Sequence, residues 1–129
     1  MREIVFRGKH KASGKWCEGN LHVDKQGVAI ITPDDTPLGC YGQVDPDTVG
    51  QYTGLTDKTG KKIFEGDVVQ MRTSGLSGRG VIVFKDGSFG IDDKKRKRFY
   101  YMYHDAVYRI DGNIHDNPEL LKGGAPDGV

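Results

Sequence analysis

Five consecutive cationic side chains stand directly before a group of aromatic ones. The run consists of Lys94, Lys95, Arg96, Lys97 and Arg98, and it is followed by Phe99, Tyr100, Tyr101 and Tyr103. Cations neutralise phosphates while aromatic rings stack on bases, so this order is typical of a groove for single-stranded nucleic acid. In a strand, Phe99, Tyr101 and Tyr103 would share one face and Tyr100 would lie on the other. The candidate nucleic-acid contacts are therefore residues 94–98 and Tyr100.

A simpler interpretation of the basic run is a solvated hairpin tip. Asp92 and Asp93 precede the run and partly cancel its charge. One face of the following aromatic strand must also pack in the core, which leaves fewer rings for bases. We therefore favour the hairpin tip and keep nucleic-acid binding as the alternative.

Two His-Asp dipeptides, at residues 104–105 and 115–116, are a possible start for a metal site. Adjacent residues on a strand point to opposite faces, however, and nothing in the spacing brings His10 or His22 to them. A capping or turn role for Asp105 and Asp116 explains the dipeptides better. We predict no metal, and rank a small metal-dependent hydrolase last among the functions.

The remaining candidates for catalysis are also weak. Cys17 and Cys40 lack a CxxC partner, which favours buried thiols over a zinc site or a disulfide. Glu65 and Asp67 lie two residues apart, as residues on one face of a strand do, but such a pair is usually a solvated face. Neither GxSxG nor HExxH occurs in the sequence. We therefore predict a protein that is not an enzyme and has no cofactor.

The segment "VGQYTGLTDKTGKKIFEGDVV", residues 49–69, combines glycines with charge. A phosphate-binding loop of this kind leads into a helix, whereas this one leads into the apolar pattern of a strand. We expect the corner of a β-barrel, in which Asp57 bonds nearby amides and Gly60 takes a left-handed conformation. The polar tip is a candidate partner contact through Thr56, Asp57, Lys58, Lys61 and Lys62.

The composition indicates a mainly β protein. The chain has 129 residues with 19 glycines and 5 prolines, and its apolar runs are only a few residues long. Asp86-Gly87 predicts a tight hairpin in "VIVFKDGSFGI". "DPDTVG" (45–50) predicts a single helical turn, and Asn117 and Pro118 a second one whose Leu120 and Leu121 pack on the core or form an exposed hook.

The charge and hydropathy exclude several kinds of partner and location. The formal net charge of +1 gives no global attraction to nucleic acid, so any such partner needs a local patch. No apolar stretch approaches the length of a membrane span, and the N-terminus lacks the pattern of a signal peptide. We predict a cytoplasmic protein that does not contact membranes.

Three blocks of the sequence resemble the YopX family of small bacteriophage and prophage proteins. They are "MREIVFRGK" with the following "GKWCEG", then "DPDTVGQYTGLTDKTGKKIFEGDVV", and finally "GNIHDNPELL". The resemblance runs from Met1 to Leu121 and implies a phage or prophage origin in a bacterial host, an SH3-like barrel within a mainly β domain, and self-association. No biochemical activity is assigned to that family, so it transfers no catalytic residue. The run "DDKKRKR" falls in the variable part of the family.

These inferences together predict one YopX-like domain over residues 1–121. Residues 1–44 form an N-terminal β segment, 50–111 an SH3-like small barrel and 112–121 a closing block, while 122–129 form a disordered tail and 32–39 a loop. The favoured function is a non-enzymatic accessory protein that acts in interaction or assembly. Its partner would be a second copy of itself, or a host or phage protein.

Overall fold

The chain forms two compact units, described here from a computed structural model. Unit 1 comprises Met1–Gly54 and unit 2 comprises Leu55–Val129. The structure describes residues 2–33 and 42–121, so most of the 32–39 loop, Cys40 and the 122–129 tail lie outside it. The fold is mainly β, as predicted, with 57% of the described residues in strands and 6% in helices. No helix in the described ranges has the length and apolar character to cross a membrane.

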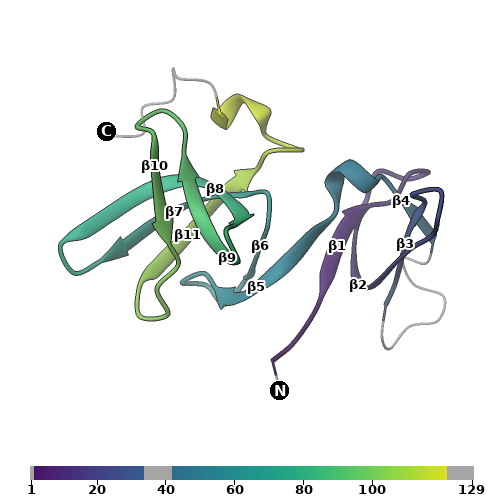
Figure 1. The fold of residues 1–129 in the computed structure, drawn as a ribbon, viewed down its shortest axis with the longest axis horizontal. Helices are drawn as coiled ribbons and strands as arrows, with labels where there is room; N and C mark the ends of the chain where they lie inside the picture. Colours follow the sequence, from purple (N-terminus) through teal and green to yellow (C-terminus); the bar gives the residue numbers. More distant parts are fainter. Residues whose placement is uncertain (1, 34–41, 122–129) are drawn as a thin grey trace. The chain divides into compact units, whose positions relative to one another are not determined.

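Unit 1 is built on an antiparallel ladder in the order β4-β3-β2-β1-β5 (Figure 1). Its strands are β1 (Phe6–Lys9), β2 (Trp16–Val23), β3 (Ala29–Thr32), β4 (Gly42–Val44) and β5 (Gly50–Thr56). The core is small, because only Cys17, Ala29, Ile31 and Val44 form its buried cluster. Phe6, Leu21 and Val49 pack against that cluster.

Two turns of unit 1 are each ordered by an aspartate, and the second of them is the helical turn predicted at residues 45–50. Asp24 Oδ1 accepts hydrogen bonds of 2.9 Å from the amides of Gln26 and Val28, and Gly27 has a φ of 87°. The short helix η1 (Pro46–Thr48) begins after Asp45, whose side chain accepts from the Asp47 amide at 3.1 Å. Both turns are therefore stabilised by an Asp that bonds nearby amides.

Cys17 is buried as predicted, but its redox state differs from the prediction. The residue is 1% exposed in the cluster of unit 1. It is disulfide-bonded in this structure, so the prediction of a free thiol at this position is wrong. Spacing alone did not indicate the bond, because a disulfide depends on how closely two Cα atoms approach in the fold.

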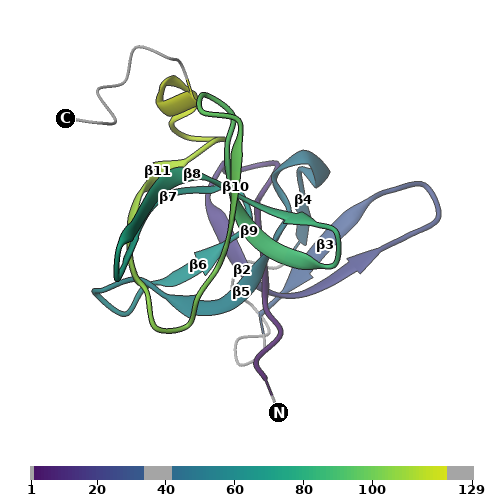
Figure 2. The same cartoon turned by 60° about the vertical axis from the view of Figure 1, so that its left-hand side comes forward.

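Unit 2 contains a five-stranded antiparallel sheet in the order β10-β9-β8-β7-β11 (Figure 2). The strands are β7 (Asp67–Thr73), β8 (Leu76–Lys85), β9 (Ser88–Asp93), β10 (Arg98–Tyr101) and β11 (Val107–Asn113). The last residues of β5 enter this unit, and β6 (Lys62–Phe64) is the neighbour of β5. Within the described residues β10 and β11 are the edges of an open sheet, so no closed barrel is formed.

The core of unit 2 is larger than that of unit 1. Its buried cluster contains six side chains, those of Ile63, Val69, Met71, Ile82, Ile91 and Tyr108. Glycines let the strands approach closely, since a methyl group at Gly80 would overlap the backbone oxygen of Asp92, and one at Gly90 would overlap the Phe99 ring. At these two positions the sheet can curve only because no side chain is present.

Most of the predicted local elements of unit 2 are present. The β8–β9 hairpin turns at Asp86 (φ 53°) and Gly87 (φ 86°), as its sequence predicts. Residues 94–97 form a turn between β9 and β10, which confirms the hairpin tip. The helix η2 (Pro118–Leu121) follows Asn117. Leu121 is 54% exposed, so of the two alternatives it does not pack in the core.

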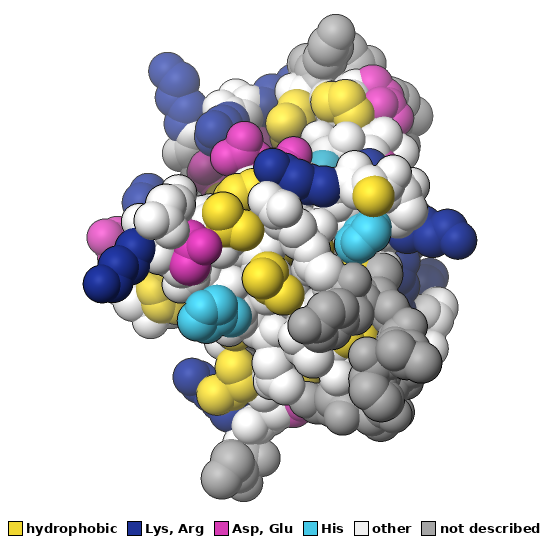
Figure 3. Space-filling model, turned by 90° about the vertical axis from the view of Figure 1, so that its right-hand side faces the viewer, with side chains coloured by type: hydrophobic (Ala, Val, Ile, Leu, Met, Phe, Trp, Pro, Cys, Tyr) yellow, Lys and Arg dark blue, Asp and Glu magenta, His cyan; other side chains and the backbone are white. Residues whose placement is uncertain are grey.

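One face of the described surface carries hydrophobic, basic and acidic side chains without a dominant type. Figure 3 shows hydrophobic, basic and acidic side chains interleaved on that face, with histidines among them. A surface of this kind has no single sign of charge. The arrangement differs in the part of unit 2 described next.

Candidate functional site

One face of the β8-β7-β11 section carries polar and cationic side chains. In the strand register, Gln70 of β7 lies between Arg79 of β8 and Arg109 of β11. Arg72 similarly lies between Ser77 and Val107. The alternate residues on β7 and β11, such as Met71 and Tyr108, are in the buried core. The alternation of each strand therefore places the arginines on the face away from the core.

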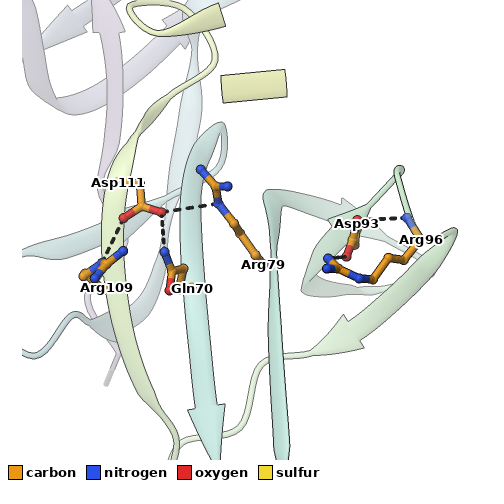
Figure 4. Close-up of polar contacts among 6 residues, drawn as sticks. All are labelled: Gln70, Arg79, Asp93, Arg96, Arg109 and Asp111. Atoms are coloured by element: carbon orange, nitrogen blue, oxygen red, sulfur yellow. Dashed lines mark hydrogen bonds and ion pairs between the residues drawn. The ribbon is translucent and has the colours of Figure 1, made fainter. Parts of the chain in front are cut away.

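The carboxylate of Asp111 connects three of these polar residues, Gln70, Arg79 and Arg109 (Figure 4). Asp111 Oδ1 accepts a 3.0 Å hydrogen bond from Arg109 Nε, and Oδ2 accepts one of 3.1 Å from Gln70 Nε2. Arg79 Nε lies 3.4 Å from the same Oδ2, close enough for an ion pair but without hydrogen-bond geometry. Arg79 and Asp111 are both largely buried, with side chains 16% and 13% exposed. Asp111 thus holds two guanidinium groups on one surface.

The β9–β10 tip is ordered by a second carboxylate. Asp93 is only 5% exposed, and its Oδ1 accepts from the Arg96 amide at 3.1 Å. Its Oδ2 accepts from Arg96 Nη1 at 3.2 Å (Figure 4). Lys97 completes the turn with a φ of 55°. The tip of the basic run therefore has a defined conformation in which Asp93 orients Arg96.

These elements line a groove of about 510 Å³ in unit 2. Among the residues that the structure describes, no carboxylate lines it, and the lining includes Gln70, Gly78, Tyr100 and six cationic residues, namely Lys58, Arg72, Arg79, Arg96, Arg98 and Arg109. Asp93 and Asp111, which pair with lining arginines, leave four positive charges in excess. The whole chain has a formal net charge of only +1. Its positive charge is therefore concentrated in this groove.

Tyr100 is the aromatic residue of β10 that lines the groove. A methyl group at Gly78 would lie 2.8 Å from its ring, so the ring rests on the backbone of β8. Its neighbours Phe99 and Tyr101 do not line the groove. The predicted division of the aromatic residues between two faces of the strand is therefore confirmed.

The structure divides the predicted basic run into two groups. Arg96 and Arg98 line the groove, whereas Lys94, Lys95 and Lys97 are exposed outside its lining. The sequence reasoning missed three further arginines of the groove, Arg72, Arg79 and Arg109. A signal was present for Arg72 and Arg109, because each directly follows a buried strand residue, Met71 or Tyr108. The nearest buried residue to Arg79 is Ile82, three positions away. Only the pairing of β7, β8 and β11 brings the three arginines together.

The candidate partner contact over residues 56–62 is a tight turn around Asp57. Burial acts to raise the pKa of Asp57, but hydrogen bonds from the Thr59 hydroxyl and from the backbone amides of Lys61 and Thr59 outweigh it and lower the pKa. The Thr59 hydroxyl donates at 2.6 Å. The backbone amide of Lys58 donates a 2.9 Å hydrogen bond to the backbone carbonyl oxygen of Tyr108, and Lys58 lines the groove. Asp57 therefore caps the turn as predicted, and the turn brings Lys58 to the groove.

The other candidates for chemistry do not converge. No three His, Cys, Asp or Glu side chains gather as a metal site in the ranges that the structure describes. Asp67, which the sequence analysis weighed with Glu65 as a carboxylate pair, is buried. Its side chain accepts a 2.8 Å hydrogen bond from the backbone amide of Phe64. Asp116 accepts from Asn113 Nδ2 at 3.2 Å, in keeping with a turn role.

Comparison with known proteins supplies the family. The family model described as YopX protein matches residues 5–122, which is nearly the whole chain. The chain belongs to the YopX family. No curated protein matches the sequence.

Two solved structures of similar fold are protein EF1440 from Enterococcus faecalis and protein yopX from Bacillus subtilis. The first has 22% sequence identity and a TM-score of 0.53, and the second has 17% identity and a TM-score of 0.55. Each comparison covers 95% of this chain and 100% of the other. At these identities the likeness shows only that this member of the YopX family shares their fold.

Proposed function

We propose that this YopX protein binds single-stranded nucleic acid in the groove of unit 2. The observation that carries the proposal is a lining with six cationic side chains and, among the described residues, no carboxylate. A polyanion gains affinity from such a lining because each neutralised phosphate releases counterions. The overall charge of the chain gives no comparable attraction elsewhere, so binding is local.

The type of cation supports a phosphate ligand. Five of the six cations are arginines, whose planar guanidinium groups match phosphate oxygens in a bidentate manner. Asp111 and Asp93 hold Arg109, Arg79 and Arg96 in position before any ligand arrives. An ordered donor loses less conformational entropy on binding than a free side chain does.

The position of the aromatic ring favours a single strand over a duplex. Tyr100 is half-buried: it packs against the buried cluster of unit 2 and rests on Gly78, and its remaining surface lines the groove. The bases of a single strand can turn out of the backbone and stack on such a ring, whereas paired bases in a duplex are already stacked. The ligand is therefore an RNA or DNA strand whose phosphates meet the arginines and one of whose bases meets Tyr100.

Fluorescence anisotropy of labelled oligonucleotides tests the proposal. The four positive charges in excess, at roughly 0.7 each, predict a slope of about −3 for log affinity against log salt. Replacing Arg72 and Arg98 by Gln removes two contacts from different strands of the groove. That pair should flatten the slope by about 1.4 and weaken binding about tenfold at about 0.15 M salt.

The chain supplies a matched control in the same basic run. Lys94 and Lys97 lie outside the lining, so replacing both by Gln changes the net charge equally and should leave the slope unchanged. Equal losses from the two pairs would overturn the groove assignment. Equal affinity for duplex DNA or heparin would also overturn it, because the site would then accept any polyanion.

Interaction or assembly, the function favoured by the sequence, stays a prediction. So do the SH3-like character of unit 2 and an accessory role in a phage or prophage. Light scattering across a wide concentration range, with and without an oligonucleotide, measures self-association. A monomer that binds the oligonucleotide would favour the groove over assembly as the function.

A further inference from the structure

The outer face of β10 carries an aromatic pair opposite to Tyr100, and in the strand register this is also the face of Gln70 and Arg79. The rings of Phe99 and Tyr101 are 5.3 Å apart between centroids and stand at 89° to each other. Phe99 lies directly over Gly90 of β9, where any side chain would overlap it. Phe99 is thus fixed against the sheet and supports Tyr101, whose side chain is 57% exposed.

Positive charge accompanies this pair. Lys85 Nζ lies 5.3 Å from the centroid of the Phe99 ring. An exposed aromatic ring beside a cation is the combination that binds a base and its phosphate without sequence preference. The same pair would attract a neutral apolar partner less well, because the ammonium group would lose water on burial.

The aromatic pair and two residues of the groove lining belong to the same strand, β10. Arg98 and Tyr100 line the groove, and Phe99 and Tyr101 alternate with them along β10. β10 is an edge of the sheet, so no further strand of that sheet lies beside it. An extended ligand can therefore pass from one face to the other over the thickness of a single strand.

We propose that Tyr101, backed by Phe99 and Lys85, is a second base-binding subsite for the strand held in the groove. The nucleic acid leaves the groove over the edge of β10, and a base beyond the groove stacks on the Tyr101 ring. This inference rests on the proposed function. It adds that the binding site is longer than the groove and has two stacking positions on opposite faces of β10.

The test measures affinity against oligonucleotide length in the full chain. Lengths from about 4 to about 16 nucleotides cover the site sizes known for small β domains. Tyr101→Ala should bind the shortest strands that fill the groove as the unchanged protein does. It should bind longer strands about 5- to 150-fold more weakly, which is the range for the loss of one stacked base.

Two further variants separate stacking from structural effects. Tyr101→Phe keeps the ring and should restore the affinity for long strands. Tyr103→Ala removes another exposed tyrosine, 44% exposed and outside both β10 and the groove lining, and should change affinity at no length. A 2-aminopurine base moved along a long strand should lose quenching in Tyr101→Ala only at positions beyond the groove.

Each result has one meaning. If the unchanged protein binds no oligonucleotide, the proposed function fails. If it binds but Tyr101→Ala matches it at every length, only the second subsite is overturned. If Tyr101→Ala weakens short and long strands equally, the ring acts on the groove itself and the second subsite is again overturned.

Discussion

In unit 1 the guanidinium carbon of Arg7 lies 4.6 Å from the centre of the Trp16 ring, and Lys9 Nζ lies 5.7 Å from it. In unit 2 Arg96, Arg98 and Tyr100 line a groove. Both units therefore combine cations with an aromatic ring. In unit 1 the combination is an internal contact, since Arg7 is only 8% exposed and its ring partner is half-buried.

The difference shows that the same residue types can stabilise a fold or form a binding surface. A cation over a ring contributes about 0.5–2 kcal/mol to stability and is then directed at that ring rather than at a ligand. In unit 2 two carboxylates hold arginines along a concave surface. The arrangement around the cations, rather than their number, separates the two roles.

The largest expected effect compares the two cores. Ile91→Ala in unit 2 and Ile31→Ala in unit 1 each remove the side chain of a fully buried residue, so each should lower the free energy of unfolding by about 2–5 kcal/mol. We expect only Ile91→Ala to weaken oligonucleotide binding at temperatures near its melting transition. Urea unfolding, followed by anisotropy of a bound oligonucleotide and by Trp16 fluorescence, measures both effects.

Trp16 is the only tryptophan of the chain and reports on unit 1. Loss of binding in Ile31→Ala while the Trp16 signal is unchanged would contradict the assignment of binding to unit 2.

A smaller effect compares two Asp side chains that order turns. Asp93 in unit 2 is buried and bonds both the amide and the guanidinium of Arg96, so Asp93→Ala should cost about 1–3 kcal/mol. Asp24 in unit 1 is exposed, and Asp24→Ala should cost about 0.5–1.5 kcal/mol. Thermal unfolding measures the two costs.

Arg96→Gln keeps the Asp93 carboxylate but removes one cation of the groove, so it should flatten the salt slope of binding by about 0.7. Lys97→Gln, in the same turn but outside the groove lining, serves as the control. A salt slope that is unchanged in Arg96→Gln would mean that Arg96 makes no phosphate contact.

The smallest effect concerns alkaline pH. Burial raises the pKa of Tyr108 from 10.0 to about 12. The hydrogen bond from its phenol to the backbone carbonyl oxygen of Tyr103 acts in the other direction and lowers the pKa, but burial has the larger effect. Because the folded pKa is raised, the neutral phenol contributes stability that is fully present below pH 10.0 and is lost as pH rises through about 12. The buried cluster of unit 1 contains no phenol within the described residues, so alkali should weaken unit 2 first.

Tyr108→Phe removes this titration and the 2.7 Å hydrogen bond to the Tyr103 oxygen, at a cost of about 0.5–1.5 kcal/mol near neutral pH. Its stability should then change less than that of the unchanged protein over the alkaline range. Unfolding by urea at several pH values, with Trp16 fluorescence as the unit 1 signal, checks the comparison. Equal alkaline losses in both proteins would exclude Tyr108 as the cause.

Local structure was predictable because it depends on neighbouring residues. Asp86-Gly87, Asp57 with Gly60, and Asp45 with Pro46 each specify a turn through hydrogen bonds or backbone preferences within about four residues. The alternation of Tyr100 with its neighbours likewise follows from the period of a strand. The same reasoning left two alternatives for Leu121, because whether a terminal apolar residue packs depends on what lies opposite it.

The sequence by itself determined the mainly β fold, the turns, the basic tip and the membership of the YopX family. The tertiary structure decided which cations act together. Arg72, Arg79 and Arg109 are far apart in the chain and meet only through the register of β7, β8 and β11. Register is set by packing of the buried faces, and no local pattern around a single arginine records which residue lies across from it.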